Sequence, residues 1–137
     1  MSKSRDLSKL GSDIGTSASE DITTSNIDTT AGRLLKVADF GVGKESITVT
    51  DLDTISGNGF YQCFSGAAGV PVVISGFVIH NEFNGEQQAA QTFIAHGGLI
   101  AANKNRMFIR HRDLGVWESW QEIYHTGNTG TAVTADV

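Results

Sequence analysis

The sequence has few cysteines, prolines and basic residues, and it has no long apolar run. Cys63 is the single cysteine, which excludes an internal disulfide and a zinc site built from several thiolates. Asp and Glu total 15 against 10 Lys and Arg, and the resulting net charge of −5 argues against a surface that binds nucleic acid phosphates. No stretch approaches the roughly 20 apolar residues of a membrane-spanning helix, so we expect no membrane insertion.

Patterns typical of catalytic and metal sites are also missing. The histidines lack the close spacing of a metal clasp, and residues 41–44 (GVGK) lack the other positions of a phosphate-binding loop. Asp51 and Asp53 are best interpreted as residues that start a helix rather than as one of the carboxylate pairs that glycosidases use. We therefore expect no catalytic residue, no cofactor and no bound metal.

Glycine is abundant, with 16 residues, and Pro71 is the only proline. This composition favours many tight turns between short strands. We expect a mainly β (β-rich α+β) fold, in which antiparallel strands form a compact knob with one short helix. Apolar runs bounded by Gly, Asn and Asp predict strands at residues 33–40, 47–50, 60–64, 72–83, 91–95, 106–112 and 117–124, and the helix is expected over residues 51–55.

Residues 1–30 differ from the rest of the chain, because they are rich in Ser, Thr and Asp and contain no aromatic residue. So polar a segment either stays flexible or becomes ordered only against other chains. We expect an extended or helical attachment and trimerisation segment over 1–30, a β-rich knob-like domain over 31–125 and a polar tail over 126–137. The expected trimer contacts are the sparse apolar residues Leu7, Leu10, Ile14, Ile22 and Ile27.

Three blocks of sequence carry a resemblance to a known family. Residues 110–128 (RHRDLGVWESWQEIYHTGN) resemble the closing segment of phage tail-fibre domains, residues 30–41 (TAGRLLKVADFG) resemble their opening segment, and residues 51–61 (DLDTISGNGFY) resemble the element that follows it. The chain thus resembles a bacteriophage tail fibre protein with a pyocin-knob-like domain. The resemblance implies a homotrimer with a mixed β-rich knob that carries or forms the host-recognition tip.

The function expected from this resemblance is that of a structural protein of the virion. It would be made in the host cytoplasm, attach to the tail or baseplate and take part in host-cell attachment. Its partners would be other tail or baseplate proteins, together with host surface polysaccharide or lipopolysaccharide. Two alternatives are a carbohydrate-binding adhesin that contacts host glycans directly and, less favoured, a polysaccharide depolymerase.

The candidate ligand-binding residues lie near the end of the domain: Trp117, Trp120, Tyr124, Arg110 and Arg112. In a continuous strand Trp120 and Tyr124 would share one face and Trp117 would lie on the other. The aromatic rings could stack on sugars or could instead anchor the core or a trimer interface. The arginines, with Arg106 and His111, could bind acidic sugars or phosphates, or could form an exposed strand face paired with Glu118 or Glu122.

Overall fold

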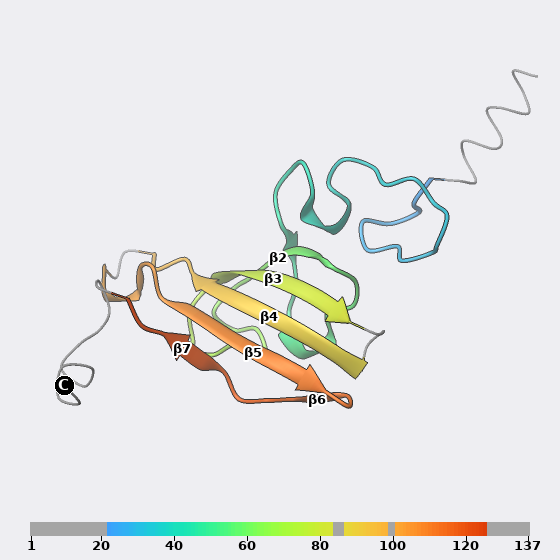
Figure 1. The fold of residues 1–137 in the computed structure, drawn as a ribbon. Helices are drawn as coiled ribbons and strands as arrows, with labels where there is room; N and C mark the ends of the chain where they lie inside the picture. The colour runs from blue at the N-terminus through green and yellow to red at the C-terminus, as the bar shows by residue number, and fades with distance from the viewer. Residues whose placement is uncertain (1–21, 84–86, 99–100, 126–137) are drawn as a thin grey trace, which may run out of the picture.

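One seven-stranded sheet dominates the computed structural model, which describes residues 22–83, 87–98 and 101–125 (Figure 1). The strands are β1 (Ile47–Thr48), β2 (Gly59–Cys63), β3 (Gly76–Phe83), β4 (Gln88–Ala95), β5 (Met107–Asp113), β6 (Val116–Trp117) and β7 (Gln121–Ile123). Their order in space is β1-β2-β3-β4-β5-β6, and β7 pairs with β5 beside β6. All neighbours are antiparallel except β1 and β2, so the sheet is mixed, and the predicted mainly β class is confirmed.

Buried and more exposed positions alternate along the two long central strands, β3 and β4. β3 and β4 pair along their whole length. Burial alternates strictly along β4, where Ala89, Gln91, Phe93 and Ala95 are all buried on one face. Such a period of two is what a strand with one covered face requires. We refer to this side of the sheet as the covered face.

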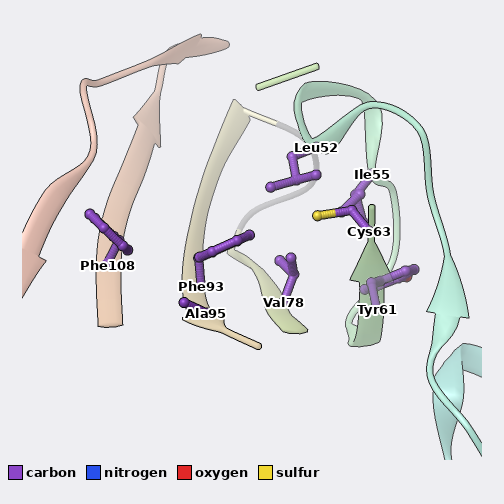
Figure 2. Packing of buried hydrophobic residues seen from close by; sticks show 8 residues of the cluster. All are labelled: Leu52, Ile55, Tyr61, Cys63, Val78, Phe93, Ala95 and Phe108. Carbon is purple, nitrogen blue, oxygen red and sulfur yellow. The ribbon is translucent and has the colours of Figure 1, made fainter. Parts of the chain in front are cut away.

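Loops and one short 3-10 helix cover that face. The 3-10 helix η2 (Leu52–Thr54) brings Leu52 over the sheet, and the Asp51 side chain caps it by accepting a hydrogen bond from the Asp53 N–H at 2.9 Å. Figure 2 shows the core that results, in which side chains of β2, β3, β4 and β5 meet those of the η2 segment. The buried cluster consists of Leu52, Ile55, Tyr61, Cys63, Val78, Phe93, Ala95 and Phe108.

The opposite side of the sheet, the open face, has no covering layer among the described residues. Two rows of paired positions run across it. The first row is Phe60, Ile79, Thr92, Ile109 and Gln121, and the second is Gln62, Phe77, Ile94, Met107 and Ile123. Several of these apolar side chains remain substantially exposed, including Phe60, Phe77, Ile79 and Ile123.

The described residues before β1 form an irregular segment that stands off the sheet on the side of β2 (Figure 1). The strand predicted over residues 33–40 is wrong, because Ala38 and Phe40 have positive φ angles of 88° and 52° that a strand cannot accommodate. The 3-10 helix η1 (Asp39–Gly41) lies there instead. The Asp39 carboxylate accepts hydrogen bonds from the Thr23 hydroxyl and the Lys36 N–H, and the first of these is the main cause of its lowered pKa.

Three further expectations need correction. The strand predicted over 72–83 begins only at Gly76, since the Ile74 N–H bonds to the Val72 carbonyl in a tight turn. The strand predicted over 117–124 is split into β6 and β7. The short helix near residue 52 is a 3-10 turn, as is η4 (Ala101–Asn103), and no α-helix occurs in the described residues.

The structure covers only part of the expected trimerisation segment. Leu7, Leu10 and Ile14 lie outside the described residues. Ile22 forms an isolated bridge with Leu34, and Ile27 is 53% exposed. Within the described ranges we find no helix long and apolar enough to cross a membrane and no group of side chains suited to hold a metal ion.

Candidate functional site

A row of polar side chains crosses the covered face where an apolar core would be expected. His80 of β3, Gln91 of β4 and Arg110 of β5 stand directly opposite one another in the strand register. All three are buried, with exposed fractions of 0%, 1% and 6%. Buried polar groups of this kind are stable only when hydrogen-bonded, so their partners decide what the row can do.

The Gln91 amide is the centre of this row. Its Nε2 donates to the Leu52 carbonyl at 2.7 Å and to His80 Nδ1 at 3.0 Å. Its Oε1 accepts from Arg110 Nε at 3.0 Å and from Arg110 Nη2 at 2.7 Å. Both amide protons and both lone pairs are therefore used, which fixes the orientation of this side chain.

His80 is held as a neutral imidazole by its partners. Because Nδ1 accepts from Gln91, the ring proton lies on Nε2, which donates to Glu82 Oε1 at 3.1 Å. Burial lowers the pKa of His80, and the hydrogen bond to Glu82 opposes this shift only in part. Glu82 Oε1 also accepts from the Gly57 N–H at 2.9 Å, so the row is tied to the loop before β2.

Arg110 lies between the two indole rings. Its guanidinium carbon is 4.2 Å from the Trp117 ring centroid and 4.4 Å from that of Trp120, and its Nη2 is 2.7 Å from Asp53 Oδ1. Burial is the main cause of the lowered pKa of Arg110, and Asp53 opposes it. Contacts of a desolvated guanidinium with aromatic faces are worth about 2 kcal/mol, so this arrangement fixes the indoles firmly.

The two indoles are in turn fastened to loops. Trp117 Nε1 donates to the Asp53 carbonyl at 3.2 Å and Trp120 Nε1 to the Gly69 carbonyl at 2.8 Å. The predicted placement of Trp117 and Trp120 on opposite faces is wrong, because the break between β6 and β7 lets both rings reach Arg110. Tyr124 follows β7 and is 58% exposed.

Arg112 occupies the next position along the covered face and differs from Arg110. It lies opposite Ala89 and Trp117, with its guanidinium carbon 4.9 Å from the Trp117 ring centroid. Its Nε and Nη2 are buried, and no group in the described part of the chain accepts a hydrogen bond from them. These two atoms form the side of a guanidinium that binds a carboxylate with two hydrogen bonds.

The arginines of the predicted basic group differ in their burial and partners. Arg106 is paired with Glu122 through Nε and Nη2, both at 2.8 Å, and this pairing raises its pKa, as the exposed ion-pair interpretation predicted. That interpretation is wrong for Arg110 and Arg112, which are buried. A ligand-binding role for Trp117, Trp120, Tyr124, Arg110 and Arg112 stays a prediction.

The parts that His80, Gln91 and Asp53 play in this network were not predicted from the sequence. A signal existed for two of them. His80 and Gln91 fall on the inward-facing positions of β3 and β4, where apolar residues alternate, and a polar residue at such a position must have a buried partner. Their pairing with each other could not be found without the register between the strands.

The free energy of unfolding should fall as the pH drops from about 7 to about 5. The folded-state pKa of His80 lies below its ordinary value of 6.5, mainly because the ring is buried. Below pH 6.5 the unfolded chain therefore binds a proton that the folded chain excludes, and stability is lost with a slope of up to about 1.4 kcal/mol per pH unit. Urea unfolding at pH 5 to 7.5 measures this slope.

His80→Gln supplies the test of that assignment, because an amide retains one donor and one acceptor but does not titrate. The slope should flatten in His80→Gln and persist in the control His111→Gln, since His111 is exposed. An unchanged slope in His80→Gln would assign the pH dependence to other groups.

The fold of this chain is similar to part of a solved pyocin fibre structure. No family model and no curated protein matches the chain. Among solved structures, it is similar to the P. aeruginosa R1 pyocin fibre comprising C-terminal residues 323–701, with 18% identity and a TM-score of 0.50. It is also similar to an N-truncated R2-type pyocin tail fibre, with 20% identity and a TM-score of 0.49.

These similarities extend over part of each molecule. The R1 match covers 63% of this chain and 23% of that chain, and the R2 match covers 61% and 33%. The chain therefore spans a third or less of the fibres it matches. At this level of identity the similarity is one of fold, and it confirms the pyocin-fibre-like domain that the three sequence blocks predicted.

Proposed function

We propose that this chain is a structural component of a phage-like tail fibre and acts in the virion as a homotrimer. The observation that carries the proposal is the similarity in fold to the R1 pyocin fibre, which agrees with the order of the three sequence blocks. In this proposal residues 1–30 attach the fibre to a tail or baseplate protein, and the sheet domain takes part in host-cell attachment. Three copies on one axis multiply a weak surface contact through effective concentration.

The segment before β1 supports assembly with other chains. Its apolar side chains are largely exposed, namely Ile27, Leu34, Leu35, Val37 and Val42. A segment that leaves so much apolar surface in water gains stability when a partner covers it. The residues expected to make trimer contacts, Ile22 and Ile27, belong to this same segment.

We also propose that Arg112, next to the polar row on the covered face, binds a ligand and takes no part in catalysis. The row itself holds the fold together: the Gln91 amide is fully hydrogen-bonded to Leu52, His80 and Arg110, and Arg110 Nε and Nη2 are bonded to Gln91 and Asp53. Arg112 differs from these residues, because its buried Nε and Nη2 have no hydrogen-bond partner in the described residues. The Nε and Nη2 side of this guanidinium fits a carboxylate or phosphate on a host glycan. Binding requires the neighbouring side chains to shift so that Arg112 becomes exposed.

The full chain is expected to have three times the 14.6 kDa mass of one protomer in light scattering after size-exclusion chromatography. The same material should sediment with some members of a panel of lipopolysaccharide-bearing bacteria, and Arg112→Met should reduce that sedimentation if the predicted ligand residues carry it. A monomer that binds no cells would contradict the fibre proposal. Release of reducing sugar from host polysaccharide would favour the depolymerase alternative instead.

A further inference from the structure

The open face of the sheet is an apolar surface without charge at its centre. Its two rows contain Phe, Ile, Met, Thr and Gln side chains and no Asp, Glu, Lys or Arg. Phe60 and Phe77 are about half exposed, at 47% and 45%. Contiguous apolar patches of this kind on a folded domain mark interaction sites.

The border of the open face is polar, as the rim of a protein interface is. Asn81 and His111 flank Ala90 in the next row, and Gln88 Nε2 donates to Asp113 Oδ1 at 3.1 Å at the end of the sheet. At the other end the His96 ring lies 5.9 Å from that of Phe77. An apolar centre within a polar rim is the usual anatomy of a specific interface.

The shape of the face also suits an interlocking partner. A hollow of about 510 Å³ lies where the small Ala90 side chain is surrounded by Asn81, Phe83 and His111. Phe83 is 74% exposed beside it. A projecting aromatic ring next to a hollow allows side chains of a second surface to interdigitate, which interface packing requires.

Charge indicates that the occupant is another copy of this chain. With a net charge of −5, two copies repel each other unless they meet where the surface is neutral. The centre of the open face is such a neutral surface. Two apolar surfaces can pack against each other without charges of opposite sign, so this face can pack against the same face of another copy. A nucleic acid or an anionic membrane finds no cation there.

We propose that the open faces of three copies pack together around a threefold axis, with the row of Ile79, Thr92 and Ile109 nearest the axis. This inference rests on the proposed homotrimer and adds to it the surface that forms it. The three sheets then share one apolar core, and the loops of each covered face point outward. Closed rotational symmetry of this kind leaves no open face exposed.

The test uses cysteine cross-linking of the full chain. Thr92→Cys should be linked to covalent dimers by a bismaleimide of about 10 Å reach, because two of three thiols near an axis can be joined. Ser119→Cys, at an exposed position in the connection between β6 and β7, should not be linked. The native Cys63 should stay silent in both, because it is buried and burial raises the pKa of its thiol.

The second part of the test places a charged residue on the open face. Ile109→Asp should give the mass of a single chain at low micromolar concentration, while Leu114→Asp, an equally polar change at an exposed turn, should leave the trimer intact. A trimeric Ile109→Asp, or linkage through Ser119→Cys in place of Thr92→Cys, would overturn this interface and leave the proposed trimer standing. A monomeric parent chain would overturn the proposed trimer itself.

Discussion

Replacing Arg110 by alanine should lower the free energy of unfolding by roughly 3–5 kcal/mol, because it truncates a large buried side chain and leaves a buried acceptor unpaired. The change leaves Gln91 Oε1 without its two donors and opens a cavity between Trp117 and Trp120. It also removes the partner of Asp53, although that side chain is about half exposed and can be hydrated. Urea unfolding at one fixed protein concentration measures the loss, since the proposed assembly would make stability depend on concentration.

Two further variants separate the buried network from ordinary surface charge. Arg106→Ala, on the same stretch of chain, removes a partly exposed pair with Glu122 and should cost about 1 kcal/mol or less. The double variant Gln91→Leu with Arg110→Met replaces both partners by apolar groups and should be less harmful than Arg110→Ala. Equal losses in Arg110→Ala and Arg106→Ala would show that the row contributes little.

Gly76→Ala should destabilise the domain by about 1–3 kcal/mol, because it overpacks the core. A methyl group at Gly76 would lie 2.2 Å from Cζ of Phe93, whose ring rests directly on the glycine backbone. Phe93→Ala should cost about 3–5 kcal/mol, since this ring is fully buried in the centre of the cluster (Figure 2). Both losses can be measured by urea unfolding.

The two changes should not be additive, because they compete for the same space. Combining Gly76→Ala with Phe93→Leu should restore part of the stability that Gly76→Ala loses, since the shorter side chain leaves room for the methyl group. Gly66→Ala is a matched control, because a methyl group there meets nothing within 4 Å. Strict additivity of the pair would mean that the close approach of Phe93 does not limit position 76.

The alternation of side chains along the central strands could be predicted from the sequence. In the strand predicted over residues 106–112, a period of two places Phe108, Arg110 and Arg112 on one face, and these are the residues that are buried in β5. The turn at residues 51–55 with its Asp51 cap was also predictable, because capping depends on residues two or three apart. These features are local, and local rules decide them.

Features that depend on distant contacts could not be predicted. Residues 33–40 have the composition of a strand, yet Phe40 is held in a left-handed conformation where its N–H bonds to the Asn26 carbonyl and its side chain is buried. The convergence of Trp117 and Trp120 on Arg110 depends in the same way on where the strand breaks. The parallel pairing of β1 with β2 left no sign in the sequence, because two residues are too few to show a pattern.

The polar contacts between the sheet and its covering loops are mainly made to the backbone of the loops. Gln91, Trp117 and Trp120 each donate to a main-chain carbonyl, those of Leu52, Asp53 and Gly69. A carbonyl oxygen is present whatever side chain its residue carries, so this anchoring survives substitution at many loop positions. The surface of the covering loops can therefore diverge quickly while the scaffold is retained, which is the property that the proposed attachment role requires when the surface to be recognised keeps changing.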